Sequence, residues 1–179
     1  MQNPKLLAIS GSLRAASRNT ALLHVAVRLF GDCDAVFADL NLPLFNEELE
    51  IGGLPKSVQT LTAQIRAADG VIFATPEYNK MIPGVLKNAL DWISRDNPQP
   101  LVSKPIALIS AAGRSGGEVS QFTMRHALAS FNTGVLQGSA FVVPNGGAAF
   151  DEAGQLLSEA QQKSLTILMG RLRDAITAV

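Results

Sequence analysis

The sequence has little of several residue types, and each shortage excludes a class of protein. Cys33 is the only cysteine, so it has no partner for a disulfide or a cysteine metal cluster, which is typical of a reducing compartment such as the cytoplasm. Fifteen basic and fifteen acidic side chains cancel, so the charge excess typical of a nucleic-acid or anionic-membrane binder is missing. We therefore expect a cytoplasmic protein whose partners are small molecules.

Long hydrophobic runs are also absent. Hydrophobic residues make up 47% of the chain, but charge, glycine or serine interrupts every run well before the roughly 20 residues needed to cross a bilayer. Residues 1–5 show no charged leader and no apolar signal segment, so we expect neither export nor a membrane span. The two histidines, His24 and His126, are far apart, which indicates no metal site. A length of 179 residues predicts one domain over residues 1–179.

Strand-like and helix-like segments alternate along the sequence. Short apolar runs typical of strands buried in a parallel sheet occupy residues 5–10, 35–38, 70–75, 105–110 and 135–143. Apolar residues at helical spacing predict helices over residues 22–30, 58–68, 83–93, 117–131 and 165–176. Gly31 suits the C-terminus of the first of these helices. This alternation predicts an α/β fold, a three-layer doubly wound sandwich whose five-stranded parallel sheet has the order 2-1-3-4-5.

The predicted strand order also indicates where a ligand binds. In open α/β sheets, ligands bind beyond the carboxyl ends of the strands, at the point where the strand order reverses. The loops after the first, third and fourth strands should therefore share one site. Residues 41–55 form a further long loop, which could line a site because long loops in compact domains are often functional.

The loop after the first strand, GSLRAASRN, is suited to a phosphate group. It lies between a strand and a helix N-terminus, where backbone N–H groups and the helix dipole favour an anion. Neutral donors come from Ser12, Ser17 and Asn19. Arg14 adds a charged fork that matches phosphate oxygens, whereas Arg18 could face solvent. Ser17 or Asn19 could also cap the helix, a role that is compatible with phosphate binding.

The same loop does not match two common nucleotide-binding motifs. It lacks the glycines of G-x-G-x-x-G, and Ser17-Arg18 stands where a Walker A motif has Gly-Lys. A dinucleotide and a nucleoside triphosphate are therefore disfavoured, and a mononucleotide phosphate is the simpler ligand.

The loop after the third strand, PEYNKMIPG, is suited to a planar ring. Pro76 and Pro83 bracket this loop and stiffen it by fixing φ. A stiff loop can present backbone N–H and C=O groups to the edge of a ring, while Tyr78 or Met81 offers a polarizable surface to its face. An isoalloxazine fits this description. The alternative is that Tyr78 and Met81 pack into the core or into an interface.

The loop after the fourth strand raises a different possibility. Gly113 to Gly117 satisfies G-x-S-x-G, the pattern of a hydrolase nucleophile elbow. Ser115 would need a histidine base, but His24 precedes it in the chain and His126 lies on the helix that directly follows it. A serine hydrolase is therefore a minor alternative.

Three segments together resemble a known family. GSLRAASRN after the first predicted strand, TPEYNKMIPGVLKNALDW after the third and ISAAGRSGG after the fourth are similar to the NADPH-dependent FMN reductases, which include quinone, chromate and azo-dye reductases. The resemblance extends over nearly the whole chain. It implies a flavodoxin-like fold, FMN as the bound cofactor and NADPH or NADH as the co-substrate.

The resemblance also assigns residues to the cofactor. It places the phosphate end of FMN on the first loop, at Ser12, Leu13, Arg14, Ser17 and Asn19. It places the flavin ring and ribityl side against the second loop, with one glycine approaching from the third: Pro76, Glu77, Tyr78, Asn79 and Gly113. Met81 stands where the family usually has a small residue and Val119 where it usually has an arginine, differences that bear on substrate access and subunit contacts.

The function implied by the resemblance is a ping-pong oxidoreductase. NAD(P)H reduces FMN, and electrons then pass to a quinone, azo compound, chromate or free flavin, with no catalytic side chain. A homodimer or homotetramer with FMN near the subunit boundary is also implied. Leu86, Leu90 and Ile93 form an apolar face that could contribute to that contact or pack in the core. A flavodoxin-like electron carrier is the main alternative function, although a net charge of zero argues against it.

Overall fold

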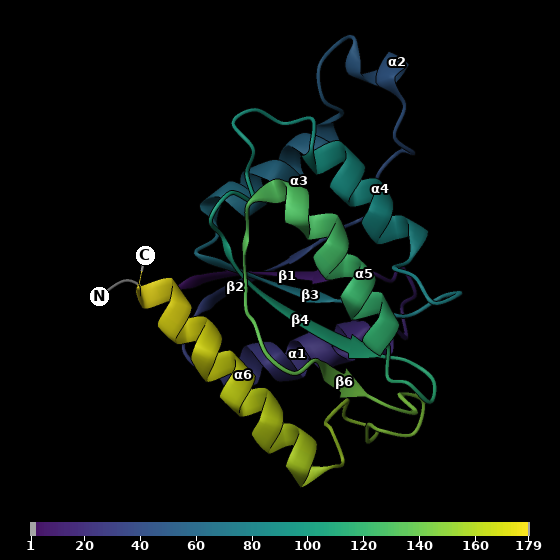
Figure 1. Cartoon of the computed structure of the whole chain (residues 1–179), viewed down its shortest axis with the longest axis vertical. Coiled ribbons are helices and arrows are strands. Elements are labelled where there is room, and N and C mark those ends of the chain that lie inside the picture. The colour runs from purple at the N-terminus through teal and green to yellow at the C-terminus, as the bar shows by residue number, and fades with distance from the viewer. Residues whose placement is uncertain (1–2, 179) are drawn as a thin grey trace.

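The computed structural model describes residues 3–178, and Figure 1 shows a central sheet with helices on both faces. In chain order the elements are β1 (Lys5–Ser10), α1 (Arg18–Phe30), β2 (Asp34–Ala38), α2 (Glu47–Glu50), α3 (Lys56–Ala67), β3 (Gly70–Ala74), α4 (Gly84–Ile93), β4 (Pro105–Ala111), α5 (Glu118–Leu128), the 3₁₀ helix η1 (Ala129–Phe131), β5 (Gly134–Val135), β6 (Phe141–Val143) and α6 (Glu159–Thr177). Residues 1–2, part of the stretch expected to carry no export signal, lie outside the described residues. Within residues 3–178, no helix has both the length and the apolar character that a bilayer crossing requires.

The strands form one parallel sheet in the order β2-β1-β3-β4-β5, which confirms the predicted order 2-1-3-4-5. Strand β1 pairs with β2 on one side and with β3 on the other, so the order reverses at β1. The loops that follow β1 and β3 therefore leave the sheet side by side at its carboxyl edge. The backbone joins them directly, because the Gly11 N–H donates to the Ala74 carbonyl at 2.8 Å.

The fifth position of the sheet holds two short strands where one continuous strand over residues 135–143 was predicted. Both β5 and β6 pair with β4 in parallel. Between β5 and β6 the chain turns away from β4 at Gly138. The φ of Gly138 is +119°, a conformation that glycine adopts far more readily than other residues. The prediction of a single strand was wrong because a turn-forming glycine interrupts the apolar run, while the parallel direction was correct.

Side chains of the central strands alternate between two apolar cores. Leu6 and Ala8 of β1 pack with α1 and α6, whereas Leu7 and Ile9 pack with α3, α4 and α5 on the other face. Strands β3 and β4 are buried along their whole length, as expected for strands covered by helices on both faces. This double burial holds the carboxyl edge of the sheet rigid beneath the loops.

The apolar face of α4 belongs to the second of these cores. Leu86, Leu90 and Ile93 are at most 3% exposed within the chain and pack against β3, β4 and α3 side chains. They are therefore core residues and do not present an apolar face to a second subunit.

Residues 41–55, which the sequence suggested as a site-bordering loop, form an arm that extends from the body of the molecule beside α4 (Figure 1). The arm contains α2 and is anchored to α4, because Asn88 and Trp92 both donate to the Pro43 carbonyl, at 3.0 and 2.8 Å. Its outward side chains Leu44 and Ile51 are 81% and 86% exposed. None of its residues lines the main cavity, so the structure does not place this loop at the site.

Helix α1 has well-defined ends that serve the site. The Ser17 hydroxyl accepts a hydrogen bond from the Thr20 N–H at 3.2 Å and caps the N-terminus. Gly31 follows the last turn with a φ of +88°, as the glycine in the sequence predicted. The N-terminus of α1 is thereby fixed in direction, toward the loops at the carboxyl edge of the sheet.

Candidate functional site

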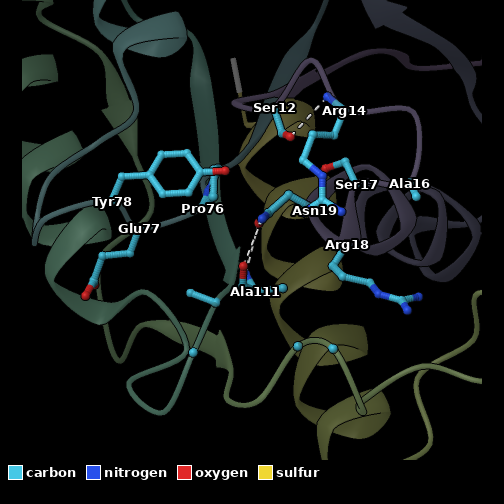
Figure 2. A pocket seen from close by; sticks show the side chains of 14 residues that line it. Ser12, Arg14, Ala16, Ser17, Arg18, Asn19, Pro76, Glu77, Tyr78 and Ala111 are labelled. Atoms are coloured by element: carbon cyan, nitrogen blue, oxygen red, sulfur yellow. Dashed lines mark hydrogen bonds between the residues drawn. The ribbon is translucent and has the colours of Figure 1, made fainter.

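A cavity of about 410 Å³ lies at the carboxyl edge of the sheet, and this volume falls within the roughly 300–1,000 Å³ of small-molecule sites. Figure 2 shows its walls, which come from four segments. The lining residues are Ser12, Arg14, Ala16, Ser17, Arg18 and Asn19 from the first loop and α1, Pro76, Glu77 and Tyr78 from the loop after β3, Ala111, Ala112 and Gly113 from the end of β4, and Gly146 and Gly147 after β6.

One end of the cavity gathers hydrogen-bond donors of the kind that suit an anion. The first backbone N–H groups of a helix have no acceptor within the helix. In α1 the Thr20 N–H is capped by Ser17, while the N–H groups of Arg18 and Asn19 have no acceptor within residues 3–178. The side chain of Arg14 bends toward Ser17 (Figure 2) and is exposed at the cavity wall. A guanidinium, a hydroxyl and free N–H groups therefore converge, which is the donor set that a phosphate requires.

Gly11 allows this anion-binding end to approach the loop after β3. A Cβ at this position would lie 2.7 Å from Leu86 Cδ1 and 3.1 Å from Pro76 Cδ, which is shorter than ordinary van der Waals contact. A larger residue here would push Leu86 or Pro76 aside, so the glycine lets the first loop lie directly beside the loop after β3.

Asn19 has a different partner from the predicted phosphate. Its side chain is 3% exposed and forms two hydrogen bonds with Ala111, donating to the carbonyl at 2.8 Å and accepting from the N–H at 2.9 Å. This pair, which Figure 2 shows, ties the first turn of α1 to the end of β4. The Asn19 amide is therefore occupied, and its backbone N–H is the group left for an anion.

The loop after β3 forms a tight hairpin. Tyr78 and Met81 exchange two backbone hydrogen bonds, of 3.3 and 3.0 Å. The two residues between them, Asn79 and Lys80, have φ values of +51° and +63°, the conformation of a two-residue hairpin turn. Tyr78 is 53% exposed, and its ring points into the cavity in Figure 2. Asn79 lies at the tip of the turn and does not line the cavity.

Glu77 lines the cavity, but its carboxylate points away from the anion-binding end (Figure 2). Oε2 accepts from the N–H groups of Val119 and Ser120, at 3.1 and 3.2 Å. Oε1 lies 3.3 Å from both Lys80 Nζ and Ser115 Oγ. Burial raises the pKa of Glu77, but the hydrogen bond from Ser120 and the ion pair with Lys80 outweigh it and hold the pKa below its ordinary value. The carboxylate is therefore ionised at neutral pH.

The remaining wall comes from glycine-rich loops after β4 and β6, and only the first was identified from the sequence. Gly146 donates to the Ala112 carbonyl at 2.8 Å, and a Cβ at Gly146 would lie 3.3 Å from the Ala111 Cβ. Its sequence signal is the pair Gly146-Gly147 just after a strand, at the carboxyl edge where ligands bind. Arg18, considered as a solvent-facing residue, is exposed and also borders the cavity.

Leu13 is the other predicted residue that lies outside this cavity. It is 55% exposed and borders a second, smaller cavity of about 200 Å³ together with Phe37 and Asp39. Of the ten residues assigned to the cofactor, eight line the main cavity, and Leu13 and Asn79 do not.

The geometry gives no support to a hydrolase. Ser115 Oγ pairs with Glu77, and within residues 3–178 neither His24 nor His126 makes a side-chain hydrogen bond to it. His24 instead stacks on Phe37, with ring centroids 4.3 Å apart. In the same part of the chain, no group of three or more His, Cys, Asp or Glu side chains could hold a metal ion.

FMN fits the residues that are present. Its phosphate requires the donor set found at Ser12, Arg14, Ser17 and the N-terminus of α1. Its flat ring requires a shallow, stiff wall, which Pro76 and the Tyr78 hairpin supply on one side. Gly113 leaves the third wall open, because nothing lies within 4 Å of a Cβ at that position.

Comparisons with known proteins identify the relatives of this chain. Residues 4–148 match the family model described as NADPH-dependent FMN reductase. The chain is 40% identical over 179 residues to an NAD(P)H-dependent FMN reductase of Pseudomonas aeruginosa, which covers 94% of this chain and 97% of the relative. It is 37% identical over 172 residues to an NADPH:quinone oxidoreductase of Arabidopsis thaliana, and the match covers 90% of this chain and 86% of that relative.

A solved structure resembles the fold closely. The flavoenzyme NAD(P)H:(acceptor) oxidoreductase FerB from Paracoccus denitrificans superposes with a TM-score of 0.87 at 28% identity, and the match covers 98% of both chains. The family match spans all four segments that line the cavity, from Ser12 to Gly147. The chain therefore belongs to the NADPH-dependent FMN reductase family, with a flavodoxin-like fold.

Proposed function

We propose that the chain uses FMN, bound in the main cavity, to pass electrons from NAD(P)H to small-molecule acceptors. The observation that carries this proposal is that an anion-binding helix end and a stiff ring-binding hairpin face each other across one cavity. The names of the relatives, an FMN reductase and a quinone oxidoreductase, support quinones and flavins as the first acceptors to test. Azo compounds and chromate are further candidates.

Different residues of the chain bind different parts of the cofactor. FMN would supply the redox chemistry when bound. Arg14, Ser12 and Ser17 bind the phosphate together with the N-terminus of α1, and the hydroxyl of Ser17 can donate to it while its oxygen caps Thr20. The loop after β3 contacts the ring and ribityl side through Pro76 and Tyr78, which line the cavity. No side chain of the cavity is required as a general acid, base or nucleophile.

NAD(P)H and the acceptor use the same open side of the cavity in turn. Glycines at positions 113 and 147 are exposed on this side, and they leave room for a planar group to approach. Two substrates that share one open face must bind one after the other, which gives a ping-pong mechanism. Steady-state rates at several acceptor concentrations should give parallel double-reciprocal lines, whereas intersecting lines would contradict a shared face.

We also propose a single domain over residues 1–179 that assembles as a homodimer or homotetramer in the cytoplasm. Leu44 and Ile51 on the arm, with Tyr78 and Met81 at the hairpin, are each at least 53% exposed, and such apolar side chains favour contact with another subunit. The lone Cys33 favours a reducing compartment.

The direct test is the colour of the purified protein. We expect a yellow protein whose flavin absorbance bleaches under anaerobic conditions on addition of NADPH or NADH and returns on addition of a quinone. A yellow protein that neither nucleotide bleaches would be an electron carrier instead. A colourless protein that does not bind added FMN would overturn the proposal.

A further inference from the structure

Glu77 links two walls of the cavity through hydrogen bonds of its carboxylate. These hydrogen bonds are separate from the proposed contacts to the phosphate and to the ring. Helix α5 begins after Gly117, which has no side chain to cap the first turn. The N–H groups of Val119 and Ser120 are satisfied instead by Glu77, 42 and 43 residues earlier in the chain. The Glu77 side chain is 8% exposed, so water does not compete freely for these bonds.

The same carboxylate also contacts the other loops near the ring. Its second oxygen pairs with Lys80 on the tip of the hairpin and with Ser115 in the loop after β4. One side chain therefore fastens the hairpin, the glycine-rich loop and the start of α5 to each other. A negative charge at a helix N-terminus is also the favourable arrangement for the helix dipole.

We propose that Glu77 is a positioning residue: its carboxylate holds the ring-binding hairpin against the first turn of α5 and cancels the positive charge of that turn and of Lys80 beside the flavin ring. The mechanical part of this role concerns the chain alone. The electrostatic part rests on the proposed function, because it requires FMN in the cavity.

The sign of the electrostatic effect follows from charge. A reduced flavin carries more negative charge than an oxidised one, and a nearby carboxylate disfavours it. Replacement of Glu77 by glutamine removes the charge but keeps a carbonyl oxygen that can accept from the α5 N–H groups. This change leaves the α5 terminus and Lys80 uncompensated, so it should favour the reduced state and raise the midpoint potential of bound FMN.

The experiment has one part that needs no cofactor. Amide hydrogen exchange is measured on FMN-free protein for wild type, Glu77→Ala, Glu77→Gln and the control Glu118→Gln. Glu118 is an exposed carboxylate in the same first turn of α5, so its replacement removes an equal charge without breaking the link. We expect exchange at residues 76–81 and 119–120 to rise about fivefold in Glu77→Ala, the typical cost of a lost cap, and to stay near wild type in Glu118→Gln.

The second part measures the midpoint potential of FMN in wild type, Glu77→Gln and Glu118→Gln. We expect a higher potential in Glu77→Gln than in Glu118→Gln, since only Glu77 lies in the cavity wall. Unchanged exchange in Glu77→Ala would overturn the mechanical role. A potential in Glu77→Gln that equals wild type would overturn the electrostatic role. If wild type fails to bind FMN, the proposed function fails, while the exchange data still decide whether Glu77 holds the hairpin to α5.

Discussion

Arg14 offers a sharp test of the phosphate end of the cavity. Its guanidinium bends toward Ser17 at the N-terminus of α1 (Figure 2), where we place the FMN phosphate. A hydrogen bond to a charged group contributes about 1.5–3 kcal/mol. Because Arg14 is exposed, solvent screening reduces the expected loss to the lower end of that range or slightly below it, about 1–2 kcal/mol. Arg14→Ala should therefore weaken FMN binding roughly 5- to 30-fold.

The assay compares two ligands and two arginines. Dissociation constants for FMN and for riboflavin, which has the same ring but no phosphate, are measured by flavin fluorescence quenching. The matched control is Arg18→Ala, because the Arg18 guanidinium lies 6.0 Å from the Phe150 ring and points away from Arg14 in Figure 2. We expect Arg14→Ala to weaken FMN but not riboflavin, and Arg18→Ala to change FMN affinity less than threefold.

Two results would refute the reasoning about Arg14. Equal losses for FMN and riboflavin would show that Arg14 acts on the ring or on folding and not on a phosphate. A larger loss in Arg18→Ala than in Arg14→Ala would move the phosphate toward the loop after β6. Raising the salt concentration should also weaken FMN binding more in wild type than in Arg14→Ala, since screening acts on the charge that the variant lacks.

Three further predictions concern stability and pH. Gly11→Ala adds a Cβ 2.7 and 3.1 Å from neighbouring side chains and should lower the free energy of unfolding, measured by urea titration, by about 1–3 kcal/mol. Gly84→Ala, whose added Cβ would have nothing within 4 Å, should be nearly neutral in the same titration. Asn19→Ala leaves the buried N–H and C=O of Ala111 unpaired and should cost about 2–4 kcal/mol by urea unfolding; a loss under 1 kcal/mol would contradict this. Because the pKa of Glu77 lies below its ordinary 4.5, the stability that its ionised form provides is complete above pH 4.5 and declines as the pH falls through the lower folded-state pKa. The difference in unfolding free energy between wild type and Glu77→Gln should therefore be constant from pH 5.5 to 7 and shrink toward pH 3, and a difference that grows on acidification would be inconsistent with a lowered pKa.

The sequence predicted those features that depend on local pattern. Buried strands read as short apolar runs, and their alternation with helices implies the strand order and the position of the site. Ser17 and Gly31 mark the ends of α1 because capping is a local property of the chain. The resemblance of three loops to one family then identified the cofactor, which the composition and spacing alone left open.

Features that depend on distant contacts could not be predicted in the same way. Asn19 has the residue type of a phosphate donor, but a backbone partner 92 residues away occupies its amide. Glu77 belongs to the ring-binding loop by sequence, whereas its carboxylate binds a helix that begins 41 residues later. The glycine pair of the loop at Gly146-Gly147 is a weak local signal, and only the folded chain shows that the loop lies beside Ala111 and Ala112 in the cavity wall. In each case the folded chain supplies the partner.

The central claim is that the N-terminus of α1 binds the phosphate of FMN and thereby places the ring against the segment from Pro76 to Tyr78. A crystal structure of the protein soaked in FMN tests it most directly. We expect the phosphate oxygens within hydrogen-bond distance of Ser12, Arg14 and Ser17, with the ring beside the hairpin. FMN bound with its phosphate outside this helix end, or with its ring away from the hairpin, would contradict the claim.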